Sequence, residues 1–144
     1  DLIELAKKTV ADYTAQMDAM NITEAVKTVW VLIGRANKYI DETAPWALAK
    51  DEAQAERLQT VMYNLAETLR LVAIMVEPFI PNAAPKIYEQ LGLGGKALKL
   101  VDAVWGGLAD GTVVVKGEPL YPRITVDKDG NTLIGGKKYV PQAK

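Results

Sequence analysis

The run Ala36-Asn-Lys-Tyr-Ile-Asp-Glu-Thr-Ala-Pro-Trp-Ala-Leu-Ala-Lys50 joins a helical pattern to a proline-tryptophan turn. Before and within this run, apolar residues recur at the i, i+3, i+4, i+7 spacing of one helix face, namely Ile22, Ala25, Val26, Val29, Ile33, Ala36 and Ile40. Pro45 ends the pattern, because proline disfavours a helical residue before it and has no amide hydrogen to donate. We therefore expect a turn at Thr43-Ala44-Pro45 that presents Trp46 beside the end of the helix.

The other face of this predicted helix carries a different chemistry. The residues that fall together there are Trp30, Gly34, Asn37, Lys38 and Asp41. They are not a simple solvated set, because they include an aromatic ring, a glycine and an amide. At the start of the helix, Asn21 and Glu24 have the spacing of a capping box, so we expect the helix to begin there.

Helical patterns extend in both directions from this helix. Roughly Leu2 to Met20 forms an amphipathic helix without an evident cap, so we expect it to begin upstream of Asp1. A long helix follows Asp51, with an apolar row consisting of Leu58, Val61, Met62, Leu65, Leu69, Val72 and Val76. Its last turns are apolar nearly all round, which predicts the most buried part of the fold. A short helix opens at Pro81 and Pro85 and stops at Gly92. We interpret residues 1–92 as an all-α bundle of three or four helices.

Residues 93–144 have a different character, because glycines separate short apolar runs. We expect an extended segment that packs back on the bundle and has a flexible end. Val113–Val115 is a candidate short strand. The turn residues Asp127–Asn131 separate Ile124–Val126 from Thr132–Ile134, which predicts a small hairpin.

Composition bounds the chemistry of the chain. Its 144 residues are 49% hydrophobic and suit one globular domain. The chain has no histidine and no cysteine, which excludes a zinc site of the usual ligands and a histidine-based triad. Asp127 and Asp129 begin like a calcium loop, but Gly130 comes two positions early and Lys138 stands where the bidentate glutamate belongs. We therefore expect no catalytic residue and no metal site.

Charge and hydropathy limit the partners. The net charge is −1, and only residues 93–144 are basic, with 8 basic against 5 acidic residues. No general basic field draws the chain to nucleic acid, so any RNA contact must be local. No run approaches the roughly 18 to 20 apolar residues that span a bilayer, and the first residues lack the positive start of a signal peptide. We expect a soluble intracellular protein with neither membrane nor DNA as a partner.

Trp46 is the strongest candidate for a binding residue. A tryptophan on a proline turn offers a rigid flat surface on which an unpaired base can stack, for about 1–3 kcal/mol. Asn37 could hydrogen-bond a base edge, and Lys50 could hold a phosphate together with Arg35 and Lys38. The alternative is that Trp46 fills the core between two helices, because tryptophan is highly buried on average.

The run 36–50 resembles the anticodon-domain signature of class I aminoacyl-tRNA synthetases, and its full form is most similar to that of the methionyl-tRNA synthetases. Two later motifs resemble the same family in the same order, Glu77-Pro-Phe-Ile-Pro81 and Trp105-Gly-Gly-Leu with Pro119-Leu-Tyr-Pro-Arg-Ile124. The resemblance covers residues 1 to about 124. It implies an α-helix bundle that binds the CAU anticodon of tRNA(Met), with Trp46 stacking on an anticodon base. Pro45 matches the residue that sets the loop, and Asn37, Asp41 and Lys50 match the remaining signature positions.

The chain departs from the family by lacking both catalytic signatures, so it should be inactive alone. For the parent protein the resemblance implies a cytoplasmic methionine-tRNA ligase that uses ATP with magnesium, its catalytic domain lying in the same polypeptide. An Asn and an Arg that the family uses for anticodon bases should lie upstream of Asp1. Two alternatives stay open: the anticodon domain of another class I synthetase, which the Ala-Pro-Trp loop disfavours, and a helical protein-interaction module with Trp30 and Trp46 in its patch.

Overall fold

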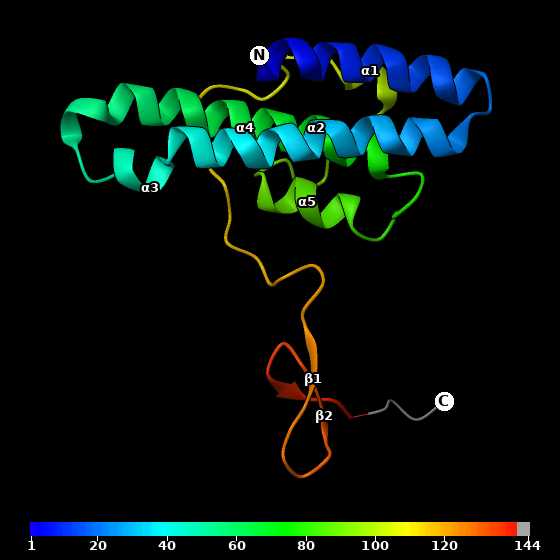
Figure 1. Cartoon of the computed structure of the whole chain (residues 1–144), viewed down its shortest axis with the longest axis vertical. Helices are drawn as coiled ribbons and strands as arrows, with labels where there is room; N and C mark the ends of the chain where they lie inside the picture. Colours follow the sequence, from blue (N-terminus) through cyan, green and yellow to red (C-terminus); the bar gives the residue numbers. More distant parts are fainter. Residues whose placement is uncertain (141–144) are drawn as a thin grey trace.

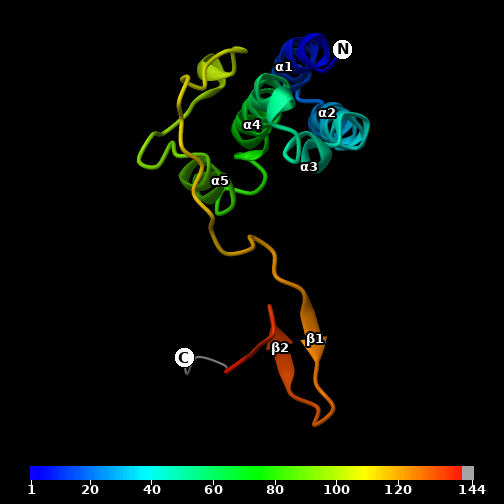
Figure 2. The same ribbon diagram turned by 90° about the vertical axis from the view of Figure 1, so that its left-hand side faces the viewer.

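The computed structural model describes residues 1–140. Three long helices lie side by side in it: α1 (Leu2–Asp18), α2 (Ile22–Thr43) and α4 (Ala55–Val76) (Figure 1). The shorter helical segments are α3 (Pro45–Leu48), η1 (Glu52–Gln54), α5 (Ala84–Gln90) and η2 (Leu100–Asp102). Viewed along the helices, α4 lies in the middle, with α1 and α2 on one side and α5 on the other (Figure 2). The predicted all-α bundle with an extended tail is therefore confirmed.

The caps of the first two helices differ from the predictions. Asp1 caps α1, because its carboxylate accepts a hydrogen bond from the Ile3 amide at 3.0 Å. The expected capping box at Asn21 and Glu24 is wrong. The Asn21 amide donates to Gln16 O at 2.8 Å, so it is not available to the Glu24 carboxylate. Glu24 accepts instead from Lys27 Nζ at 2.7 Å.

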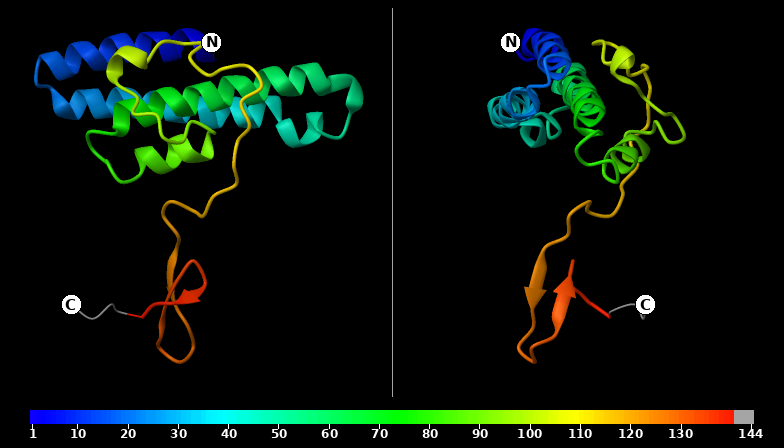
Figure 3. Two further views of the ribbon diagram at one scale, coloured as in Figure 1. Left: turned by 180° about the vertical axis from the view of Figure 1, so that it is seen from behind. Right: turned by 90° about the vertical axis from the view of Figure 1, so that its right-hand side faces the viewer.

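The core is deepest in the second half of α4, as predicted, since all residues from Leu71 to Val76 are buried. The predicted apolar row fails at Met62 and Leu69, which are 49% and 52% exposed. Met62 lies in the first half of α4, which α1 does not cover (Figures 1 and 3), and it lines a hollow with Leu108 and Val114 of the tail. Leu69 follows Met62 by seven residues and so lies on the same face of α4. On α2 the central buried residue is Leu32, which the predicted stripe omitted.

After α5 the chain crosses the bundle with η2 as its one helical segment and then leaves it. Gly92 stops α5 with a φ of +74°, as predicted, and a side chain there would meet Val113 O at 2.4 Å. The predicted strand at Val113–Val115 is wrong, because these residues pair with no strand among residues 1–140. Its pairing is with the end of α5, where the Val115 amide donates to Gln90 O at 2.7 Å.

The predicted hairpin is present, at a distance from the bundle (Figure 3). Strand β1 (Ile124–Val126) pairs antiparallel with β2 (Thr132–Ile134), which also pairs with β3 (Lys137–Lys138). The Asp127 carboxylate shapes the turn by accepting from the amides of Asp129 and Asn131 at 3.0 and 2.8 Å. Residues 141–144, the end of the predicted tail, lie outside the described residues.

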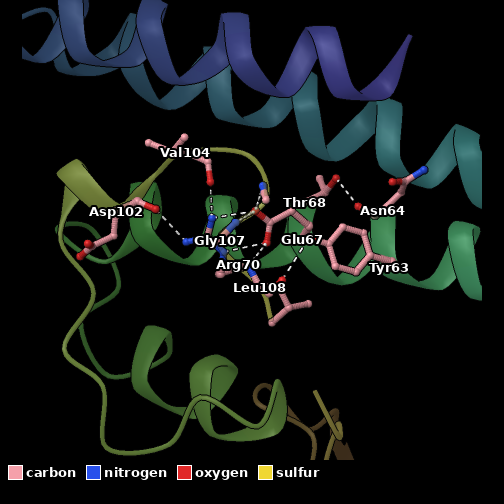
Figure 4. A network of polar contacts seen from close by, with 10 residues as sticks. Tyr63, Asn64, Glu67, Thr68, Arg70, Asp102, Val104, Gly107 and Leu108 are labelled. Atoms are coloured by element: carbon pink, nitrogen blue, oxygen red, sulfur yellow. Dashed lines mark hydrogen bonds and ion pairs between the residues drawn. The ribbon is translucent and has the colours of Figure 1, made fainter. Parts of the chain in front are cut away.

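A buried ion pair on α4 anchors the segment that follows α5 (Figure 4). Glu67 and Arg70 are 0% and 2% exposed, and the guanidinium donates twice to the carboxylate, at 2.8 and 2.7 Å. The amides of residues 106–108 also donate to the Glu67 carboxylate, at 2.7, 2.9 and 3.1 Å. Five hydrogen bonds therefore converge on one buried carboxylate, which compensates it for the loss of water.

The guanidinium of Arg70 holds the other end of the same segment. It donates to Asp102 O at 2.8 Å and to Val104 O at 2.6 Å. Gly107 passes so close that a Cβ there would lie 2.5 Å from Arg70 Nη2, which explains the glycine. The Tyr63 hydroxyl adds a hydrogen bond to Leu108 O at 3.0 Å.

Candidate nucleic-acid interface

The junction between α2 and α3 is a sharp turn at one end of the bundle. Ala44 takes a left-handed conformation with φ 42° and ψ 63°, because the proline after it disfavours the right-handed helical region. For a residue with a Cβ this conformation costs roughly 1–2 kcal/mol. The turn then continues directly into α3, with Pro45 at its first position.

Trp46 projects from this turn into solvent. Its side chain is 57% exposed, and no residue of α3 is buried. The alternative that Trp46 fills the core is therefore wrong. The helix α3 is held by its contact with the first half of α4 and by hydrogen bonds from the backbone amides of Ala47 and Leu48 to Ala44 O, at 2.8 and 3.2 Å. A large aromatic surface is thus exposed on a short, fixed support.

The other predicted site residues lie at the same end of the bundle. Asn37 and Asp41 occupy the exposed face of the last two turns of α2, four residues apart, and Lys50 follows α3. All three are exposed, whereas Pro45 is half-buried. Within residues 1–140 the side chains of Asn37, Asp41 and Lys50 form no hydrogen bond, so their polar atoms are available to a partner.

The predicted phosphate contacts Arg35 and Lys38 differ from each other. Arg35 is engaged with other residues of α2, with its Nη1 3.1 Å from Glu42 Oε2 and its guanidinium 5.8 Å from the centre of the Tyr39 ring. The angle to Glu42 is too poor for a hydrogen bond, so this buried nitrogen has no hydrogen-bond partner among the described residues. Lys38 Nζ lies 3.7 Å from Glu42 Oε1 with its side chain 71% exposed. Of the two, Lys38 is the better placed to reach an external phosphate.

A polar groove beside this turn was not predicted. It has a volume of about 490 Å³ and lies between the last turns of α2 and the first turns of α4. Its lining residues are Tyr39, Thr43, Ala53, Glu56, Arg57, Thr60 and Val61. A spacing of three and four residues puts Glu56, Arg57 and Thr60 near one side of α4. That spacing shows a shared face, but only the packing shows that the face borders a groove.

Solved structures identify the class of this bundle. The chain is similar to the apo form of methionyl-tRNA synthetase from Mycobacterium tuberculosis, with a TM-score of 0.78 and 29% identity over 88% of this chain and 26% of that one. A structure of the same organism's enzyme in complex with methionyl-adenylate gives a TM-score of 0.77 and 30% identity, over 85% of this chain and 24% of that one. The fold is that of a helical domain of an aminoacyl-tRNA synthetase.

Sequence relatives specify the family. Residues 1–132 match the family described as the anticodon binding domain of methionyl tRNA ligase. The methionine–tRNA ligase of Bacillus subtilis is 47% identical over 89% of this chain, and that of Clostridium perfringens is 48% identical over 89%. The chain belongs to the family of methionyl-tRNA ligase anticodon-binding domains. It spans about one fifth of the length of these relatives, 19% and 20% respectively.

Proposed function

We propose that this chain binds the CAU anticodon of tRNA(Met), and that Trp46 stacks on one of the anticodon bases. The observation that carries the proposal is the 57% exposure of Trp46 on a proline turn, at the same end of the bundle as Asn37 and Asp41. A splayed base that stacks on an aromatic ring contributes about 1–3 kcal/mol to the free energy of binding. This geometry suits a single-stranded loop, whose bases can leave the stack.

The polar residues around Trp46 supply the selectivity in this proposal. The Asn37 amide both donates and accepts hydrogen bonds, so it can read a base edge. The Asp41 carboxylate only accepts, so it favours bases with exocyclic amino groups and disfavours a nearby phosphate. Lys50 is an exposed cation that can pair with the loop backbone. With a net charge of −1, such local contacts have to supply the affinity.

The parent protein in this proposal is a cytoplasmic methionine-tRNA ligase, which joins methionine to tRNA(Met) with ATP and magnesium. Its catalytic domain belongs to the same polypeptide, outside this chain. Among residues 1–140 no group of three or more histidine, cysteine, aspartate or glutamate side chains is placed to hold a metal ion. No helix in that range is long and apolar enough to cross a membrane.

The experiment is a binding titration of the full-length protein with a tRNA(Met) anticodon stem-loop. Trp46→Ala should weaken binding by roughly 5- to 150-fold, from the stacking energy of about 1–3 kcal/mol. Trp30→Ala is the matched control. Trp30 is 58% exposed on the same face of α2 as Asn37 and Asp41, but it lies about four turns from the junction between α2 and α3. We expect Trp30→Ala to bind normally.

A stem-loop with a changed anticodon completes the design. Selective binding to CAU that is lost in Trp46→Ala supports the proposal. Equal binding of both loops by the wild-type protein would refute anticodon reading. A folded Trp46→Ala variant with normal affinity would remove the assigned role of Trp46. In that case the exposed Trp30 and Trp46 side chains would favour a protein-interaction surface instead.

A further inference from the structure

We propose that the groove between α2 and α4 binds a second nucleotide of the anticodon loop, beside the one stacked on Trp46, and that Arg57 and Glu56 contact the edge of its base. This inference rests on the proposed function. Nothing in the anticodon signature 36–50 assigns Arg57, Glu56 or Thr60 a role. The evidence is the position of the groove, its size and the state of its polar groups.

The position follows from the path of the chain. One wall of the groove is the last turn of α2, at Tyr39 and Thr43, and the other is η1 with the first turns of α4, at Ala53 and Arg57. The segment that connects the two walls is the one that carries Trp46 (Figures 1 and 2). A loop that places one base on Trp46 therefore has neighbouring nucleotides within reach of the groove.

The size of the groove suits one nucleotide. Its volume of about 490 Å³ falls within the range of roughly 300–1,000 Å³ that small-ligand sites occupy. Val61, which is 3% exposed, lines the groove together with the charged and polar side chains of Glu56, Arg57 and Thr60.

Of the three arginines in the helices, Arg57 is the one whose guanidinium has no ion-pair or hydrogen-bond partner among residues 1–140. Arg70 makes four hydrogen bonds inside the fold, and Arg35 lies against Glu42 and the Tyr39 ring. Arg57 is exposed and makes neither an ion pair nor a hydrogen bond with any residue from 1 to 140. Its planar fork is free to contact two acceptors on one base edge.

The remaining groups supply both donors and acceptors. The hydroxyls of Thr43 and Thr60 donate to Tyr39 O and Glu56 O at 2.6 and 3.1 Å, which leaves oxygen lone pairs as acceptors. The Tyr39 hydroxyl accepts from Asn64 Nδ2 at 3.3 Å, so its own proton remains to be donated. The Glu56 carboxylate offsets the charge of Arg57. A groove that is neutral in sum and mixed in donors and acceptors fits a base edge better than a bare phosphate.

The test uses the full-length protein and the tRNA(Met) anticodon stem-loop. Arg57→Gln should weaken binding by about 30-fold, the middle of the range for a two-bond contact to a base. Arg57→Lys should weaken it almost as much, because a lysine keeps the charge but loses the fork. Lys86→Gln on α5 is the control for loss of an exposed positive charge and should bind as the wild type does. Each variant is checked for unchanged thermal unfolding.

Stem-loops with single base changes beside the stacked base identify the contact. The inference predicts one position at which a base change weakens binding to the wild type by about 30-fold but weakens binding to Arg57→Gln little. A loss in Arg57→Gln that is equal at all bases, or full rescue in Arg57→Lys, would overturn base reading. If Arg57→Gln binds normally while Trp46→Ala does not, the groove role fails and the proposed function stands. If the wild type does not bind the stem-loop, both fail.

Discussion

Replacing Glu67 by alanine should destabilise the fold by about 3–5 kcal/mol, the usual cost of removing one partner of a buried ion pair. The structure shows why the cost is this large. Two hydrogen bonds from Arg70 and three from the amides of residues 106–108 end on this carboxylate. Bonds to a charged group contribute about 1.5–3 kcal/mol each, so all five together would exceed the prediction. The loss is smaller because the loop can detach and its amides can bind water.

The assay is urea unfolding of the 144-residue chain, with Glu89→Ala as the control because Glu89 is exposed on α5. Hydrogen exchange should show the amides of residues 106–108 opening in Glu67→Ala well below global unfolding. The double variant Glu67→Met with Arg70→Met should be more stable than Glu67→Met alone, since it leaves no unpaired buried charge. A loss under 1 kcal/mol for Glu67→Ala, with those amides still protected, would refute this account of the clamp.

Three further measurements test other parts of the structure. Gly107→Ala should destabilise the fold by about 1–3 kcal/mol, because its Cβ would clash with Arg70. Gly34→Ala should stabilise α2 by about 0.5–1 kcal/mol, because a Cβ there meets nothing within 4 Å. Chemical denaturation of the two variants compares these changes. Burial is the larger cause, and the hydrogen bond to Glu77 the smaller, of a raised pKa at Tyr88. The free energy of unfolding should therefore fall as pH rises above about 10, where the tyrosine ionises only in the unfolded chain. Tyr88→Phe should reduce this dependence of stability on pH. Hydrogen bonds from Asn131 lower the pKa of Asp127, so the hairpin turn should weaken as pH falls through that lowered value. NMR shifts of the turn amides would show this change, and Asp127→Asn should lose the pH dependence.

The turn between α2 and α3 could be predicted from the sequence, because it depends on local chemistry. Pro45 forbids a continued helix, and the chain has few ways to leave α2 that also satisfy its last carbonyl groups. The exposed face of Asn37 and Asp41 follows from the period of the helix alone. Periodicity could not decide whether Trp46 was buried, because a tryptophan after a helix can turn either way. The exposure is decided by α3, which packs on α4 from the side that leaves the ring in solvent.

Apart from the capping box at Asn21, which fails locally, the errors depend on neighbours that are distant in the sequence. Met62 has the spacing of a core residue, but it is 49% exposed and lines a hollow with Leu108 and Val114 of the tail. Glu67 and Arg70 look like surface residues, because charged side chains are rarely buried unless they are paired. Their partners lie 32 to 41 residues away, in a glycine segment without periodicity. The only local signal is that both charges directly precede the apolar last turns of α4, residues 71–76.

α4 connects the two regions that matter for the parent protein. Its first turns form one wall of the groove beside Trp46, and its middle holds residues 102–108 through Glu67 and Arg70. Arg57 and Glu67 are ten residues apart on one continuous helix, a rise of about 15 Å. A variant of the clamp that leaves the groove intact should therefore keep affinity for an anticodon stem-loop while it loses stability. If Glu67→Ala also lost selectivity for the CAU loop at a temperature where the bundle is folded, then the clamp would shape the interface as well as the tail.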